Sequence, residues 1–104
     1  MGRKLPPDQM ELYRRVDEVL HYVWDPIGVA GVPEARDEYQ SYLPHVFSLL
    51  QRDAPSDEIT SFLLTTATEH MGLFGKRQLQ KRAAEVTQIL QSWRHVIREP
   101  PSTA

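Results

Sequence analysis

The sequence predicts an all-α fold, a compact array of about four helices. Apolar residues recur every three or four positions in four segments, no segment alternates apolar and polar residues as a strand does, and 104 residues suit one domain. The predicted helices are residues 8–24, 41–52, 56–71 and 76–98. We expect residues 8–98 to form a single helical domain, with residues 1–7 and 99–104 as flexible tails.

The first predicted helix, residues 8–24, has a favourable charge pair and a clear end. Glu11 precedes Arg15 by one turn, the order that stabilises a helix. Asp25 precedes a proline, which disfavours the α region and ends the helix. Residues 25–33 then place apolar side chains among two glycines and two prolines. We expect an apolar loop that packs inward, with the Asp25 carboxylate capping a turn.

The start of the second helix, residues 41–52, depends on Pro44. A proline ring inside a helix costs about 3 kcal/mol, so we place the regular helix after a Ser41 cap. Residues 34–40 then form a separate turn. A continuous helix that is kinked at Pro44 is the alternative.

The third helix, residues 56–71, has start and stop signals. Ser56 suits the N-cap, and acidic residues follow it. Gly72 is the predicted C-terminal stop, with Leu73 and Phe74 as a hydrophobic seal over the helix end.

The last helix, residues 76–98, combines an apolar seam with basic faces. Its apolar residues alternate steps of four and three; they are Leu79, Ala83, Val86, Leu90, Trp93 and Ile97. This seam is interpreted as core, with a dimer interface as the alternative, and an exposed Trp93 would mark a contact site. A possible basic contact face consists of Lys76, Arg77, Lys81, Arg82 and Arg94.

Composition narrows the classes of function. Cysteine is absent, which excludes disulfides and thiol nucleophiles. The chain has no apolar run of about 20 residues and no signal-peptide pattern, and Pro6 stands where a myristoylation signal has Ser or Thr. We therefore expect a cytoplasmic protein without a membrane segment. The four histidines lack the spacing of metal ligands, so we expect neither a metal nor a cofactor.

One cluster of polar and aromatic residues is a candidate ligand or partner site; it comprises Trp24, Asp25, Asp37, Glu38, Tyr39 and Tyr42. If the loop folds back onto the second helix, Asp25, Glu38 and the two tyrosines line one pocket. Such a pocket suits a cation, an amine or a partner's arginine. In the alternative interpretation the aromatic rings belong to the core and the acids hydrogen-bond loop amides.

Three sequence segments also resemble a known family. They are WDPIGV at residues 24–29, PEARDEYQSY at residues 33–42 and MGL at residues 71–73. The pattern resembles the YugE-like family of small bacterial helical proteins, over roughly residues 12–90. The resemblance implies a small helical bacterial domain and no particular activity, and the segments can mark either a shared site or a shared loop structure.

These observations leave three hypotheses about function. The first is a protein-interaction or accessory module, of the immunity type among others, without catalytic activity and with an unknown protein partner or a second copy. The second is an enzyme or small-ligand binder that uses Asp25, Glu38, Tyr39 and Tyr42. The third is nucleic-acid binding through the basic last helix, which the acidic remainder of the chain and a pI near 6.0 disfavour.

Overall fold

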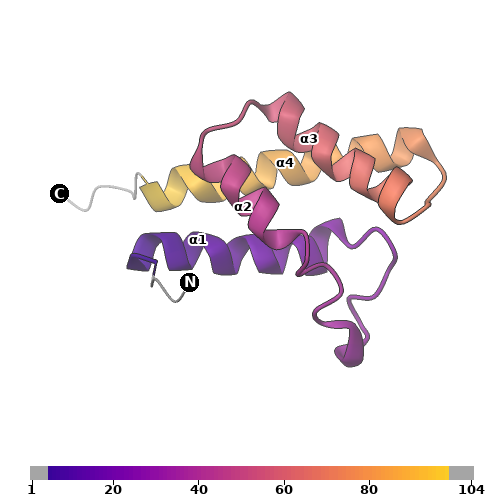
Figure 1. Ribbon diagram of the computed structural model, residues 1–104, viewed down its shortest axis with the longest axis horizontal. Coiled ribbons are helices and arrows are strands. Elements are labelled where there is room, and N and C mark those ends of the chain that lie inside the picture. The colour runs from indigo at the N-terminus through magenta and orange to yellow at the C-terminus, as the bar shows by residue number, and fades with distance from the viewer. Residues whose placement is uncertain (1–4, 99–104) are drawn as a thin grey trace.

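The structure, a computed structural model, describes residues 5–98 and confirms the all-α prediction (Figure 1). Its four α-helices are α1 (Pro7–Glu18), α2 (Leu43–Gln51), α3 (Ser56–Thr65) and α4 (Lys76–Arg98). Two π-helical segments, Val19–Trp24 and Thr66–His70, extend α1 and α3, and a 3₁₀ turn spans Pro33–Ala35. Of the predicted tails, residues 1–4 and 99–104 lie outside the described residues, whereas Leu5 packs against the core and Pro7 begins α1.

Helix α4 is the longest helix, and the other helices pack along it (Figure 1). It runs antiparallel to α3, because the Ser56 hydroxyl donates a 2.9 Å hydrogen bond to Gln91 and the Thr60 and Thr87 hydroxyls lie 2.8 Å apart. Helices α1 and α4 are also antiparallel, since Arg15 of α1 meets Trp93 near the C-terminal end of α4, whereas Arg82, nearer the start of α4, bonds the carbonyl of Val23, beyond the end of α1. Helix α2 lies obliquely to α1 and α4 and contacts all three other helices (Figure 1).

A single apolar core lies between the four helices. In the predicted seam of α4, Ala83, Val86 and Leu90 are completely buried, and the other three members are half-buried against the same core. The seam therefore packs in the core, as predicted. None of the described helices combines the length and apolar character that are needed to cross a bilayer.

Both of the extended helices end differently from the prediction of regular helices at residues 8–24 and 56–71. The amide of Asp25 donates to the carbonyl of Leu20, and the amide of Met71 donates to Thr66, five residues back in each case. These wider turns are π-helical. In the first one, four of six side chains are buried, including three that are consecutive in sequence, Val19, Leu20 and His21.

Helix α2 begins two residues later than predicted. Pro44 lies in its first turn, where the missing N–H would have had no partner within the helix. Tyr42, not Ser41, precedes the helix, and no side chain caps it, so the predicted Ser41 cap is wrong. Residues 36–42 form separate turns, so the kinked-helix alternative is also wrong.

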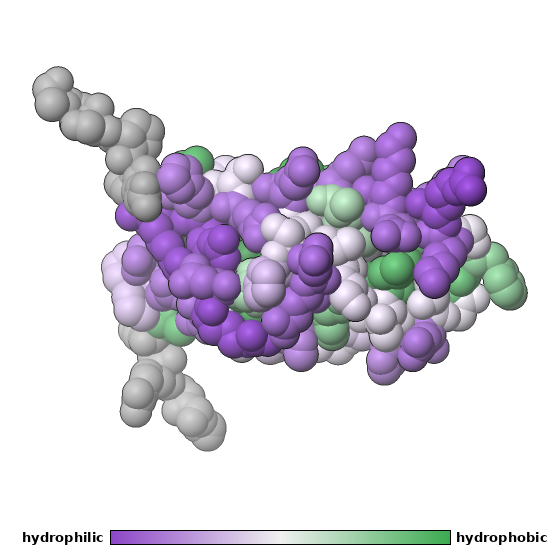
Figure 2. All heavy atoms as spheres, turned by 90° about the horizontal axis from the view of Figure 1, so that it is seen from above, coloured by the Kyte–Doolittle hydropathy of each residue, from purple (hydrophilic) through white to green (hydrophobic). Residues whose placement is uncertain are grey.

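Two predictions about α3 need correction. Ser56 is the first helical residue rather than the cap, and its hydroxyl reaches across to α4. Gly72 adopts φ of +68° at the end of the π-helical segment, as a C-terminal stop should. Leu73 packs against the core, but Phe74 is 95% exposed and seals nothing. Hydrophobic atoms protrude at the end of the molecule where α3 joins α4 (Figure 2).

Candidate functional site

The loop after α1 is closed by a cluster that we call the Asp25 clasp: the side chains of Asp25 and Tyr39 and the backbone amides of Ile27, Val29 and Ala30. Asp25 adopts a left-handed conformation with φ of 32°, which turns its carboxylate back over the loop. The carboxylate accepts hydrogen bonds from the amides of Val29 at 2.7 Å and Ala30 at 3.0 Å. It also accepts a 2.7 Å hydrogen bond from the Tyr39 hydroxyl. The Tyr39 hydroxyl oxygen in turn accepts a 3.1 Å hydrogen bond from the Ile27 amide.

Aromatic packing holds the clasp against the end of the first helical segment. Tyr39 is 2% exposed, and its ring centroid lies 5.4 Å from that of Trp24. Tyr42 meets Trp24 edge-on at 6.4 Å. The structure therefore brings four of the six predicted site residues together. The other two, Asp37 and Glu38, are exposed to solvent.

The ionisation of the clasp follows from these contacts. Burial raises the pKa of Asp25, but the hydrogen bonds from Tyr39, Val29 and Ala30 outweigh it and hold the pKa below its ordinary value. Burial, followed by the hydrogen bond to the Asp25 carboxylate, raises the pKa of Tyr39 well above its ordinary value. At neutral pH the pair is therefore a carboxylate and a phenol. Both carboxylate oxygens already accept protein donors, which fits the interpretation of the acid as a support for the loop.

His21 is a residue that sequence reasoning missed. It is 2% exposed, its Nδ1 atom has no hydrogen-bond partner within residues 5–98, and its ring lies 6.5 Å from that of Tyr39. It also lines a hollow of about 320 Å³ together with Arg36 and the loop. The sequence held a signal that His21 belongs near this site: it precedes Asp25 by four residues, one helical turn, so both residues lie on the same side of the helix end. No three His, Asp or Glu side chains gather as metal ligands within residues 5–98.

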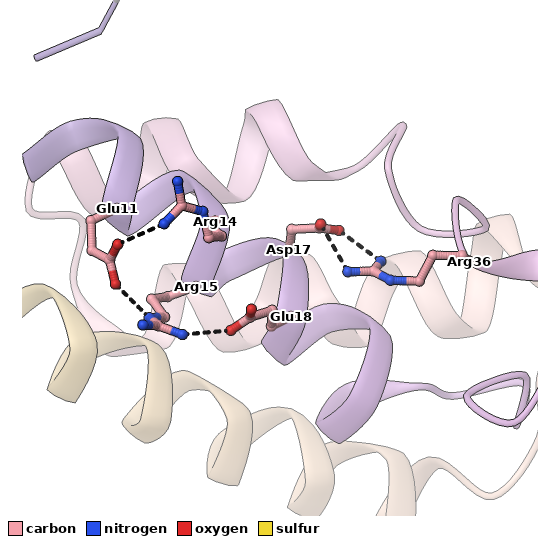
Figure 3. Close-up of polar contacts among 6 residues, drawn as sticks. All are labelled: Glu11, Arg14, Arg15, Asp17, Glu18 and Arg36. Atoms are coloured by element: carbon pink, nitrogen blue, oxygen red, sulfur yellow. Dashed lines mark hydrogen bonds and ion pairs between the residues drawn. The ribbon is translucent and has the colours of Figure 1, made fainter. Parts of the chain in front are cut away.

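Ion pairs along α1 link this loop to the helix bundle (Figure 3). Arg36 forms two hydrogen bonds with the Asp17 carboxylate, at 3.0 and 3.1 Å. One turn away, Arg15 lies between Glu11 and Glu18, at 2.7 and 2.9 Å, which confirms the predicted Glu11–Arg15 pair.

The predicted basic face of α4 divides into two groups. Arg82 donates a 2.7 Å hydrogen bond to the carbonyl of Val23, and Arg94 reaches the carbonyl of Leu50 at 3.4 Å and the Asp53 carboxylate at 3.5 Å. These two arginines hold neighbouring segments in place. The other three are exposed and form no ion pair with a described residue; they are Lys76, Arg77 and Lys81.

An apolar groove of about 590 Å³ lies on the outer face of α4 and is lined by Glu85, Gln88, Ile89, Ser92, Trp93 and Val96. We call it the α4 groove. Trp93 lines the groove but is half-buried: it packs against the core, and the Arg15 guanidinium lies over its ring at 4.7 Å. Val96 is 47% exposed.

A more polar hollow of about 350 Å³ adjoins the α4 groove and is lined by Gln78, Lys81, Arg82 and Glu85. Glu85 lines both depressions, so they form one continuous surface along α4. Sequence reasoning noticed Trp93 but not this surface, because Ile89 and Val96 lie outside the seam.

Comparison of the chain with protein-family models, with curated proteins and with solved structures finds no match.

Proposed function

We propose that this chain is a non-catalytic protein-interaction module, and that the α4 groove receives a helix of a partner protein. The observation that carries the proposal is the groove itself, an open and mostly apolar surface on a helix that buries Ala83, Val86 and Leu90 in the core on another side. An accessory or immunity-type role in the bacterial cytoplasm, which sequence and family resemblance suggested, belongs to the same proposal.

The shape of the groove supports a helical occupant. Its lining residues recur every three or four positions from Glu85 to Val96, so the groove follows the helix axis. At about 1.5 Å per residue this length is about 17 Å, or three turns. An amphipathic helix that places residues at the same spacing packs its ridge into such a groove.

The other two hypotheses draw less support from the geometry. An enzyme based on Asp25 and Tyr39 needs a carboxylate and a phenol that face a ligand, but three hydrogen bonds from the chain engage the carboxylate and Tyr39 is 2% exposed. Nucleic-acid binding needs many cations that are free to meet phosphates, but backbone carbonyls engage Arg82 and Arg94, which leaves only Lys76, Arg77 and Lys81 of the predicted face.

The test is affinity capture of the tagged protein from lysate of its native cells, treated with nuclease, beside two matched variants. Val96→Glu places a charge in the groove, and Val32→Glu places the same charge in the loop at similar exposure, 44% against 47%. Because both side chains are largely exposed, neither change should unfold the protein, and circular dichroism checks this.

We expect a protein that is captured by the parent chain and by Val32→Glu but lost with Val96→Glu. Capture that Val96→Glu leaves unchanged, or a capture with no protein partner, contradicts the proposal.

A further inference from the structure

The polar end of the outer α4 surface carries cations that the fold does not explain. Arg77 and Lys81 lie one turn apart, on the same face as Glu85, and form no ion pair with any described residue. Arg77 also belongs to the first turn of α4, where the helix dipole disfavours positive charge. By contrast, the arginines that serve the fold, Arg82 and Arg94, bind backbone carbonyls.

The apolar end of the same surface begins two turns further along. From Lys81 to Ile89 is eight residues, or about 12 Å along the axis, and from Ile89 to Val96 is about 10 Å more. One side of α4 thus presents a basic stretch followed by an apolar stretch, joined at Glu85.

From this arrangement we infer the chemistry of the occupant, an inference that rests on the proposed function. The partner segment is an amphipathic helix of about five turns with acidic residues at one end and apolar residues at the other. Its acidic end lies over Arg77 and Lys81, and its apolar residues fill the α4 groove between Ile89 and Val96. Charge complementarity at one end and apolar burial at the other fix the direction in which it binds.

A second copy of this chain fits the surface less well. Helix α4 carries six basic residues and one acidic residue, Glu85. A second copy that met this face through its own α4 would offer Arg77 and Lys81 only one acidic partner, Glu85.

The first part of the test measures affinity for the captured partner by titration, with two charge-reversal variants. Arg77→Glu combined with Lys81→Glu should weaken binding about tenfold at low salt, and less in 0.5 M NaCl, because exposed charge pairs are screened. Lys76→Glu is the matched control: it is equally exposed but lies about 140° around the helix from Lys81, so it should change affinity less than twofold.

The second part locates the partner segment. A photo-crosslinking amino acid replaces Gln78 in one variant and Ser92 in another, and mass spectrometry maps the crosslinked peptides. We expect both crosslinks in one helix of one partner, about 14 residues apart, with Asp and Glu concentrated near the Gln78 crosslink.

The outcomes separate the two proposals. If Val96→Glu abolishes binding while the Arg77/Lys81 reversal behaves like Lys76→Glu, the protein is an interaction module and the inferred acidic helix is wrong. A Gln78 crosslink to a basic or neutral segment, to a lipid, to RNA or to a second copy also overturns the inference. If Val96→Glu has no effect, both proposals fail.

Discussion

The Asp25 clasp and the outer face of α4 are both rich in charged and aromatic residues, yet their side chains are used in opposite ways. In the clasp, one carboxylate accepts three hydrogen bonds from its own chain. On the outer face of α4, Arg77 and Lys81 form no ion pair with a described residue, and Val96 faces solvent. The difference teaches that a conspicuous sequence motif can serve the fold, while a plain amphipathic helix can leave a surface for a partner.

The largest expected effect is on the clasp. Asp25→Ala leaves the amides of Val29 and Ala30 and the Tyr39 hydroxyl without their acceptor, and should lower the free energy of unfolding by about 2–4 kcal/mol. Urea denaturation measures the loss. The control is Asp37→Ala, an exposed acid in the same region, which should cost less than about 0.5 kcal/mol. Equal losses in the two variants would mean that the clasp does not support the fold.

A smaller loss is expected from the tyrosine of the clasp. Tyr39→Phe keeps the ring against Trp24 but removes the donor to Asp25 and the acceptor of the Ile27 amide, at a cost of about 1–2 kcal/mol. Tyr42→Phe makes the same chemical change on a half-buried ring and should be nearly neutral. The comparison fails if Tyr42→Phe destabilises the protein as much.

The clasp should also give stability a pH dependence. The folded pKa of Asp25 is below its unfolded value, so its contribution is complete above the ordinary carboxyl pKa and is lost as pH falls through the folded pKa. The folded pKa of Tyr39 is raised, so its contribution is complete below the ordinary phenol pKa, near 10, and declines at higher pH. Unfolding titrations of the parent and Asp25→Asn should therefore converge in acid. A gap that stays constant down to pH 2 would argue against an anionic clasp.

The smallest effects on stability are expected on the outer face of α4. Lys81→Glu and Val96→Glu should each change the free energy of unfolding by less than about 0.5 kcal/mol, because both side chains are exposed. Thermal melts of both variants test this. If either variant lowered the free energy of unfolding by more than about 1 kcal/mol, this face would also support the fold and would not differ from the clasp in this respect.

Local signals predicted much of this fold. Asp25 before a proline ends the first helical segment, and Gly72 ends the third, because each constraint lies within a few residues of the chain. Ser41 and Ser56 were wrongly predicted as caps, since Pro44 fits the first turn of α2 and Gln91 of α4 competes for the Ser56 hydroxyl.

The candidate site was harder to predict, because it depends on contacts between distant residues. The alternative with aromatic rings in the core and acids bonded to loop amides holds for Tyr39 and Asp25. The hydrogen bond between these two side chains was not predicted, because it depends on the left-handed turn at Asp25. Arg94 donates a hydrogen bond to the carbonyl of Leu50 at the end of α2. This role could not be predicted from the sequence of α4 alone, in which Arg94 resembles any other cation. The resemblance to the YugE-like family stays a prediction.

The exposed Phe74 has a consequence for how the chain can be divided. It lies between Gly72 and Gly75, both with positive φ, in the segment that joins α3 to α4. Such a segment can enter the active site of a protease without unfolding a helix, so chymotrypsin should cut first after Phe74. The cut would leave α4 as a separate peptide held by its buried seam and by side-chain hydrogen bonds to the other segments. Residues 1–74 and 75–104, produced separately, should then reassemble. The affinity between the two fragments would measure how strongly the core binds α4.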